Sequence, residues 1–174
     1  SGVGLVGNIT LSGSVNGAYS LDIEADQANA AVAGPIGQST ALSSLTINGN
    51  NISVGQIGNA SPGVSGTTSI TSVGSTTFTA SIYNANTQSY SAGTVFNMTS
   101  ASPITFSSHG HPITFSTGTI ELLGGANLTV NSTGGNISLA NIDASLGSLL
   151  TLTLNAGSGS VQVGAVGTAS TNEF

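Results

Sequence analysis

The architecture of this protein is indicated first by the stretch Leu128-Thr-Val-Asn-Ser-Thr-Gly-Gly-Asn-Ile-Ser-Leu-Ala-Asn-Ile142. Apolar side chains occupy every second position on both sides of the Gly134-Gly135 pair. A period of two is typical of β-strands, and Gly and Asn favour the backbone conformations of tight turns. The stretch therefore predicts a strand, a turn and a second strand.

The same pattern recurs along the chain. Leu152–Val166 begins 24 residues after Leu128, and Leu45–Ile57 begins 24 residues after the start of Leu21–Ile36. Repeats of this length bury their apolar faces only by stacking on their neighbours, which is the signature of a solenoid. We therefore expect an all-β parallel β-helix of about seven coils, each of about 24 residues. The alternative fold is an antiparallel β-sandwich that serves as a filament subunit.

The repeats predict a single β-solenoid domain over residues 1–167. Residues 58–94 hold the most degraded copies, so we expect an irregular, insert-bearing part there, with loops at 58–66 and 83–94 presented to a partner. Residues 168–174 match no repeat and are interpreted as a tail or linker. Because the chain starts at a Ser and shows no signal-peptide pattern, we expect a processed product or a segment of a longer protein.

The composition argues against several classes of function. The net charge is −6, and the chain contains no Lys and no Arg. Nucleic acids and anionic lipid surfaces are bound largely through basic side chains, so we expect neither as a partner. There is no Cys for disulfides or thiolate chemistry, and no apolar run is long enough to insert into a membrane as a helix. Instead, 28 Ser and 22 Thr supply the hydroxyl groups that hydrate a weakly charged surface.

Asparagine occupies the same place in three of the four repeats. Asn48, Asn131 and Asn155 each follow a Leu-Thr-apolar run, and Glu24 takes this place in the fourth copy. Equal positions of neighbouring coils lie one above another, where Asn side chains can hydrogen-bond along the stack. We therefore predict a structural ladder formed by these three asparagines.

The densest charge lies at Asp22, Glu24 and Asp26, which a strand would place on one face. Carboxylates are ligands for Ca²⁺, but the Gly-rich Asp loop of calcium repeats is missing, so a solvated face is the preferred interpretation. A glycosidase needs two carboxylates that face each other across the sugar. No such pair is indicated, and there is no Trp to form a sugar platform.

His109 and His111 are the two histidines of the chain, and they lie between two copies of the run Pro-Ile-Thr-Phe-Ser, at 103–107 and 112–116. A His-x-His pair in a strand can bind Zn²⁺ or Cu²⁺. The intervening Gly110 and the following Pro favour a turn instead. The Gly-x-Ser-x-Gly elbow of serine hydrolases is missing, so we predict a non-enzymatic protein with no catalytic residues, metal or cofactor.

Seven Asn-x-Ser/Thr sequences would accept N-linked sugar if the producing cell glycosylates its surface proteins. Their number is close to what this composition gives by chance, so glycosylation is permitted rather than implied. The asparagines are Asn8, Asn51, Asn59, Asn97, Asn127, Asn131 and Asn136.

The lead Ala41-Leu-Ser-Ser-Leu45 and the repeats that start at Leu45, Leu128 and Leu152 resemble those of large secreted adhesins of the filamentous haemagglutinin type. The resemblance implies a right-handed parallel β-helix, secretion, and a role in adhesion or in an extracellular fibre. The partners it implies are a host or neighbouring-cell surface, a carbohydrate, or copies of the chain itself in a filament. The missing Lys and Arg depart from the usual pattern of that family, which leaves open a subunit of another extracellular filament.

Polysaccharide lyases also use β-helices, and a carbohydrate-active enzyme is therefore the remote alternative. These enzymes depend on Lys or Arg as bases, and neither residue occurs in this chain. No catalytic or ligand-binding motif of the adhesins matches the sequence either. The sequence thus predicts a structural or adhesive role.

Overall fold

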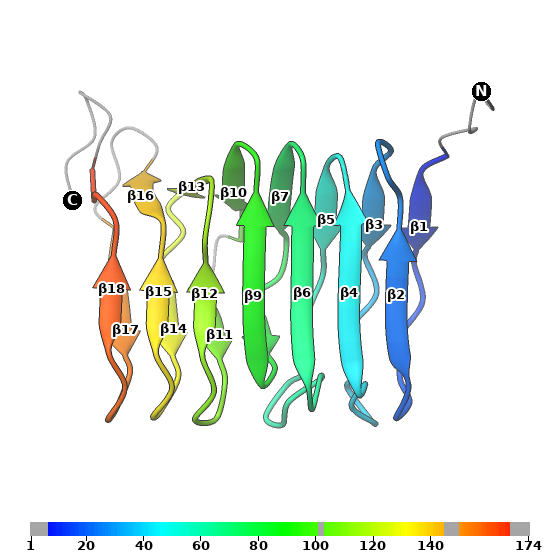
Figure 1. The fold of residues 1–174 in the computed structure, drawn as a ribbon, viewed down its shortest axis with the longest axis horizontal. Helices are drawn as coiled ribbons and strands as arrows, with labels where there is room; N and C mark the ends of the chain where they lie inside the picture. The colour runs from blue at the N-terminus through cyan, green and yellow to red at the C-terminus, as the bar shows by residue number, and fades with distance from the viewer. Residues whose placement is uncertain (1–6, 101–102, 145–149, 168–174) are drawn as a thin grey trace.

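The computed structural model describes residues 7–100, 103–144 and 150–167. These residues form eighteen β-strands, and no helix occurs among them. The strands stack into three sheets that run along the molecule (Figure 1). Sheet A contains β1 (Ile9–Leu11), β3 (Ala30–Val32), β5 (Ile52–Val54), β7 (Ser75–Phe78), β10 (Val95–Met98), β13 (Thr119–Leu122) and β16 (Asn141–Ala144). Sheet B contains β8 (Ile82–Asn84), β11 (Ile104–Ser107), β14 (Leu128–Asn131) and β17 (Leu152–Asn155). Sheet C contains β2 (Ser20–Glu24), β4 (Ser44–Gly49), β6 (Thr67–Ser72), β9 (Thr87–Ala92), β12 (Ile113–Phe115), β15 (Ile137–Leu139) and β18 (Val161–Val163).

All pairs between these strands are parallel, which confirms the predicted β-solenoid and excludes the antiparallel sandwich. Successive aligned residues of sheet C are 24, 23, 20, 25, 24 and 24 positions apart, so its seven strands span six full turns. These residues are Leu21, Leu45, Thr68, Gln88, Ile113, Ile137 and Val161. At the usual spacing of neighbouring strands, the stack is about 30 Å long.

The coil is right-handed. In Figure 1 the strands of sheet C point upward at the front, and the chain then passes over the top to the strands of sheet A behind them. The coils advance from right to left in this view, so the rotation is clockwise along the direction of travel. This is the handedness that parallel crossover connections adopt almost without exception.

Sheet B is continued toward the N-terminus by single bridges rather than by strands. Val15, Ile36, Ile57 and Tyr83 form one column of parallel bridges, and Tyr83 leads into β11 of sheet B. The column keeps the third side of the coil closed where sheet B has no strand. Inward-pointing side chains from all three sides therefore meet in one continuous core.

The stretch 58–94 keeps the regular coil over most of its length. β6, β7, β8 and β9 all lie within it and pair in register with their neighbours. The expectation of a presented loop at 83–94 is therefore wrong. The period of two is hidden there because polar side chains point inward at Thr68, Thr76 and Gln88, where they are fully buried.

Residues 58–66 do leave the strands, as expected, but two glutamine side chains hold this loop, Gln38 from the preceding coil and Gln56 from just before the loop. The Nε2 atoms of Gln38 and Gln56 both donate to the carbonyl oxygen of Gly58, at 2.5 and 2.8 Å. Gly63 is buried and so close to Gly58 that a Cβ on either residue would overlap backbone atoms. The exposed residues of the loop are 59–61, at the tip, and Ser65.

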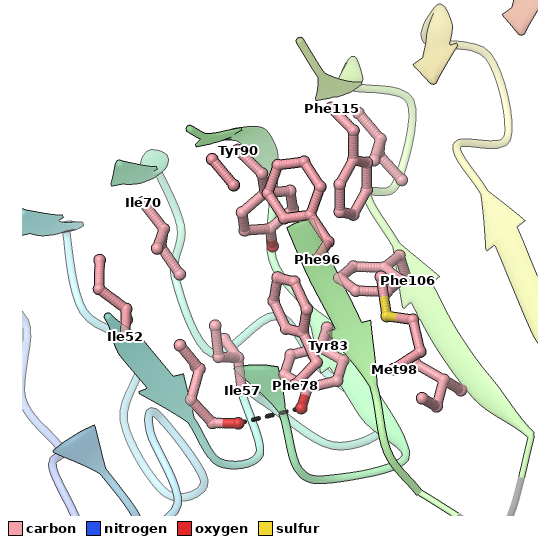
Figure 2. Close-up of a cluster of buried hydrophobic side chains, with 14 of the residues drawn as sticks. Ile52, Ile57, Ile70, Phe78, Tyr83, Tyr90, Phe96, Met98, Phe106 and Phe115 are labelled. Atoms are coloured by element: carbon pink, nitrogen blue, oxygen red, sulfur yellow. Dashed lines mark hydrogen bonds between the residues drawn. The ribbon is translucent and has the colours of Figure 1, made fainter. Parts of the chain in front are cut away.

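The centre of the solenoid is filled by six aromatic rings (Figure 2). They belong to Phe78, Tyr83, Tyr90, Phe96, Phe106 and Phe115. Phe78 lies in the middle of the cluster, edge-on to Tyr83, Tyr90 and Phe106 with ring centroids 4.9, 5.3 and 5.1 Å away. Such edge-to-face pairs stabilise a core beyond the burial of apolar area alone.

Hydrogen bonds satisfy both buried tyrosine hydroxyls. Tyr83 donates to the carbonyl of Val54 at 3.1 Å and accepts from the amide of Ala80 at 2.9 Å. Tyr90 donates to Oε1 of the buried Gln88 at 2.9 Å, and the Gln88 amide group in turn donates to backbone carbonyls. The buried Gln88, which interrupts the apolar pattern in the sequence, thus serves to hold the Tyr90 hydroxyl inside the coil.

Candidate functional site

The predicted asparagine ladder is divided between two sheets. Asn48 lies in sheet C beside Glu24, and its Nδ2 donates to Oε1 of Glu24 at 2.6 Å. Asn131 and Asn155 are aligned neighbours in sheet B. The grouping of all three asparagines in one ladder is therefore wrong, because a coil contains several strands with the same period and the Leu45 and Leu128 repeats occupy different sides of it.

Even the aligned pair in sheet B forms no amide ladder. Oδ1 of Asn131 is buried and has no hydrogen-bond partner among the described residues. Oδ1 of Asn155 accepts from the backbone amide of Gly157, two residues further along the chain. This second contact is a local turn, of the kind that Asn commonly forms.

Other asparagines join the coils, at the corners where strands begin. One column of such residues consists of Asn8, Asn29 and Asn51. Oδ1 of Asn8 accepts from the backbone amide of Asn29 at 3.1 Å, and Oδ1 of Asn29 accepts from the amide of Asn51 at 3.2 Å. Oδ1 of Asn51 accepts from the amide of Ser75 at 3.1 Å. The Nδ2 of Asn51 also donates to Oδ1 of Asn29 at 3.1 Å. Each side chain thus supplies an acceptor to a backbone amide beside a strand end.

The same contact recurs at four further corners. The acceptor and donor pairs are Asn16 with Ser39, Asn127 with Thr151, Asn136 with Ser160 and Asn141 with Ala165, at distances of 2.7 to 3.0 Å. The sequence interpretation missed this role for all seven asparagines, four of which it named only as candidate glycosylation sites. A signal for it was present, since most of these asparagines directly precede the first inward-pointing residue of a strand, as in Asn51-Ile52.

The candidate glycosylation sites fall into three structural groups. Asn8, Asn51, Asn127 and Asn136 are corner residues of the kind just described. Asn97 and Asn131 lie within strands β10 and β14, and Asn59 lies at the tip of the 58–66 loop. Attachment of a sugar to Nδ2 would leave Oδ1 free to accept its hydrogen bond, so the corner contacts and the sequons are compatible.

The three acidic residues near the N-terminus do not share one strand face. Asp22 and Glu24 point outward from β2, whereas Asp26 lies in the following turn with a left-handed φ of 49°. Asp26 lies outside the strand because β2 ends at Glu24, two residues earlier. Throughout the described ranges, no three His, Asp or Glu side chains converge as a metal site would require.

The two histidines lie in a turn, as predicted. His109 and Gly110 have φ values of 50° and 91°. Nε2 of His109 is 2.8 Å from Oδ1 of Asn84, one coil away, and Nδ2 of Asn84 donates to the carbonyl of Asn59. His109 therefore joins two coils, and His111 is an exposed neighbour in the same turn.

The outer face of sheet C carries aligned columns of polar side chains. Its central column is Asp22, Thr46, Ser69, Ser89, Thr114, Ser138 and Gln162, one residue from each of the seven strands. A second column beside it contains Glu24, Asn48, Thr71 and Ser91. Between the acidic end and Gln162, every member of these two columns is a short, uncharged, polar residue.

Most of these hydroxyl groups form no hydrogen bond with another described residue. Among the described residues, no hydrogen bond is formed by the hydroxyls of Thr46, Ser69, Thr71, Ser89, Thr114 and Ser138, although Ser91 is paired with Thr117. They repeat at the strand spacing of about 4.8 Å on a rigid support. Chemically, the face offers a lattice of donors and acceptors without formal charge.

A shallow depression lies at the corner between sheets C and A. It has a volume of about 240 Å³ and is lined by Gln27, Asn50 and Val73. Val73 is 71% exposed. The turn at 25–29 is longer than the corresponding turns of the following coils, and the hollow lies beside this longer turn. Two amide groups and one apolar side chain suit it to a small neutral group rather than to an ion.

Comparison of the chain with protein-family models, with curated proteins and with solved structures finds no match. No helix among the described residues is long and apolar enough to cross a membrane. The fold and its faces place the protein in the class of parallel β-solenoids. The resemblance to filamentous haemagglutinin-like adhesins remains a prediction.

Proposed function

We propose that the chain is a non-enzymatic, extracellular structural segment of a surface adhesin or fibre, and that it binds neutral polysaccharide through the outer face of sheet C. The observation that carries this proposal is the uncharged column from Thr46 to Ser138 on five stacked strands of sheet C. The fully packed core beneath it keeps the column straight and its spacing constant.

Many weak contacts would act together on such a face. A single hydrogen bond contributes on the order of 1 kcal/mol after the loss of bonds to water, so one hydroxyl cannot hold a sugar by itself. A preorganised row of donors and acceptors adds such contacts without the entropy cost of ordering each side chain separately. Long, repetitive carbohydrates on a host or neighbouring-cell surface match this kind of surface.

Charge narrows the class of ligand. The chain has no Lys or Arg, and Asp22 and Glu24 flank one end of the face. Sulfated, phosphorylated or uronic-acid polymers would approach carboxylates without any cation to bind them. The proposed ligand is therefore a neutral polymer, such as a glucan, a mannan or chitin.

The test is a binding assay with insoluble neutral polysaccharides and a sulfated polymer as comparison. Ser69→Glu places a charge in the middle of the face, and Ser53→Glu places the same charge on the outer face of sheet A as the matched control. We expect at least tenfold weaker binding for Ser69→Glu and unchanged binding for Ser53→Glu. Equal losses in both variants, or no binding of wild-type protein to any neutral polymer, would contradict the proposed face.

The non-enzymatic part of the proposal has its own test. Incubation of the same polymers with the protein should release no reducing sugar. Turnover that disappears in Asp22→Ala or Glu24→Ala would instead show that the acidic strand end is catalytic. Exposure of the protein at the surface of intact producing cells, measured with an antibody, tests its extracellular placement.

A further inference from the structure

The depression lined by Gln27, Asn50 and Val73 crosses three neighbouring coils. Gln27 lies in the turn that follows β2, whereas Asn50 and Val73 are the first residues after β4 and β6. In Figure 1 these three connections lie at the top, where the chain passes from sheet C to sheet A. The depression therefore lies at the rim of the proposed binding face, just beyond the ends of three of its strands.

The backbone around the depression is held by hydrogen bonds between coils. The amide of Asn50 donates to the carbonyl of Ala28 at 2.7 Å, and the amide of Val73 donates to the carbonyl of Gly49 at 3.0 Å. In the next coil the register places Gly93 beside Val73, and this glycine has no side chain that could cover it. Val73 is therefore 71% exposed on a backbone that is fixed in place.

The polar groups of the depression are available to a ligand. Gln27 is exposed and Asn50 is half-buried, and their side-chain amides form no hydrogen bond with another described residue. Each amide group offers N–H donors and a carbonyl acceptor. The depression thus combines donors, acceptors and the apolar surface of Val73.

An acetamido group has the matching parts. It carries an N–H donor, a carbonyl acceptor and a methyl group, so the two amides can pair with its polar atoms while Val73 packs against its methyl. A sugar hydroxyl in the same place could accept and donate hydrogen bonds but would leave Val73 uncovered. The volume of about 240 Å³ lies below the range of about 300–1,000 Å³ for pockets that take drug-sized ligands, so the depression suits a single sugar residue with its substituent.

Charge selects among the N-acetylated sugars. Asp26 directly precedes Gln27, and Glu24 is the last residue of β2, where the same turn begins. The chain has no Lys or Arg to offset these carboxylates. An N-acetylated sugar that itself carries a carboxylate or a sulfate would therefore meet like charge here. Neutral N-acetylhexosamines are the class that fits.

We propose that the depression binds the acetamido group of a neutral N-acetylhexosamine, as one residue of a polymer that lies on the face of sheet C. Val73 covers the acetamido methyl, and Gln27 and Asn50 pair with the amide of the sugar. The inference rests on the polysaccharide binding proposed for this face, and it narrows the ligand from neutral polymers in general to N-acetylated ones such as chitin.

Chitin and cellulose provide the test, because their chains have the same linkage and differ at the acetamido group. In a binding assay with the full chain, we expect a preference for chitin of roughly tenfold, the order given by one buried methyl group and one added hydrogen bond. Val73→Ser and Asn50→Ala should each reduce this preference by roughly threefold or more without changing the affinity for cellulose. Val95→Ser is the matched control, since Val95 points outward from β10 beside Ser75 and Thr119, and it should change neither affinity.

A soluble sugar locates the site independently of the polymers. Titration with N,N′-diacetylchitobiose should shift the side-chain amide signals of Gln27 and Asn50 in the NMR spectrum, and the same concentration of cellobiose should not. Unshifted signals would overturn the assignment of the depression. A spectrum that responds equally to both sugars would overturn it as well.

The outcomes separate this inference from the proposed function. Equal affinity of the wild-type protein for chitin and cellulose would overturn the acetamido site and leave the binding face of sheet C standing. Binding of neither polymer would overturn the face, and the NMR titration would then still decide whether the depression takes the acetamido group. Tighter binding of chitosan, the deacetylated polymer, would show that Asp26 and Glu24 attract an amine and would overturn the assignment.

Discussion

Asn48 and Glu24 occupy equal positions in neighbouring coils, 24 residues apart, and Nδ2 of Asn48 donates to Oε1 of Glu24 at 2.6 Å. The contact shows that residues one repeat apart in sequence are direct neighbours in space. Their side chains are therefore paired in the same way as cross-strand partners in any sheet.

Asn48→Asp tests this pairing. The substitution replaces a donor by a second carboxylate beside Glu24, and directly opposed like charges on a sheet are destabilising. We expect the free energy of unfolding to fall by about 0.5–1 kcal/mol at low salt, and by less at high salt, where exposed charges are screened. Urea denaturation at two salt concentrations measures the difference, with Asn48→Ser as the uncharged control. A loss that does not depend on salt would contradict an electrostatic origin.

The corner asparagines should stabilise the stack. Asn51→Ala removes the acceptor of the Ser75 amide and the donor to Asn29, all at an exposed corner where water replaces part of the loss. We expect destabilisation by about 1 kcal/mol, seen as a lower urea midpoint with an unchanged slope. Thr71→Ala, which removes an outward hydroxyl without a protein partner, should leave the midpoint nearly unchanged.

The aromatic cluster should dominate the stability of the middle coils. Phe78 contacts five other rings, and Phe78→Ala would leave a large cavity among them. We expect a loss of about 3–5 kcal/mol in the free energy of unfolding. Thr77→Ala, at the neighbouring outward position of β7, is the control. A cost below about 1 kcal/mol would mean that the cluster is loosely packed.

Close packing of the coils should make one glycine indispensable. A Cβ at Gly93 would lie 1.8 Å from the carbonyl oxygen of Val73 in the coil below, and this backbone atom cannot move without breaking the ladder. Gly93→Ala should therefore cost about 1–3 kcal/mol or more. At Gly13 a Cβ would meet nothing within 4 Å, so Gly13→Ala should be tolerated. Similar midpoints for the two variants in thermal unfolding would contradict the register of these coils.

Alkaline pH should destabilise the protein through its buried tyrosines. Burial raises the pKa of Tyr83 and of Tyr90 above the ordinary tyrosine value of 10.0. Above about pH 10 the unfolded chain releases these protons while the folded chain retains them, so the folded state then binds more protons. This stabilisation is fully present below pH 10 and is lost as the pH rises toward the folded pKa values.

The measurement is the urea midpoint at about pH 8 and at about pH 11, combined with the absorbance of tyrosinate. Ionisation of the buried tyrosines should coincide with loss of the β-sheet signal in circular dichroism. Tyr90→Phe should show a smaller decrease in midpoint between the two pH values. A wild-type midpoint that does not change over this range would contradict the expected effect.

The repeat, and the stacking of residues one repeat apart in neighbouring coils, could be predicted from sequence. The offset of 24 residues between Leu128 and Leu152, and between Leu21 and Leu45, correctly identified coil neighbours. Inward and outward positions also follow directly from alternation in β4 and β14. The reason is physical: period two and stacking period are both local properties that one chain must repeat in order to bury its apolar side chains.

The phase between distant repeats could not be predicted in the same way. Leu45 and Leu128 have nearly identical surroundings in sequence, yet they lie on different sides of the coil. The coil from Thr68 to Gln88 is several residues shorter than the others, so it interrupts the 24-residue spacing of aligned positions. Buried polar side chains also hide the alternating pattern of the strands there. The sequence interpretation therefore placed Asn48 of sheet C in one ladder with Asn131 and Asn155 of sheet B.

The amino-acid sequence by itself determined the class of fold, the period of the coil and the lack of basic side chains, because these depend on residue type and spacing. Tertiary structure decided which asparagines join the coils and which hydroxyls share one face. Those relationships depend on the register of strands about 24 residues apart, and register is set by packing across the whole stack rather than by any single repeat. The proposed binding face rests on that register.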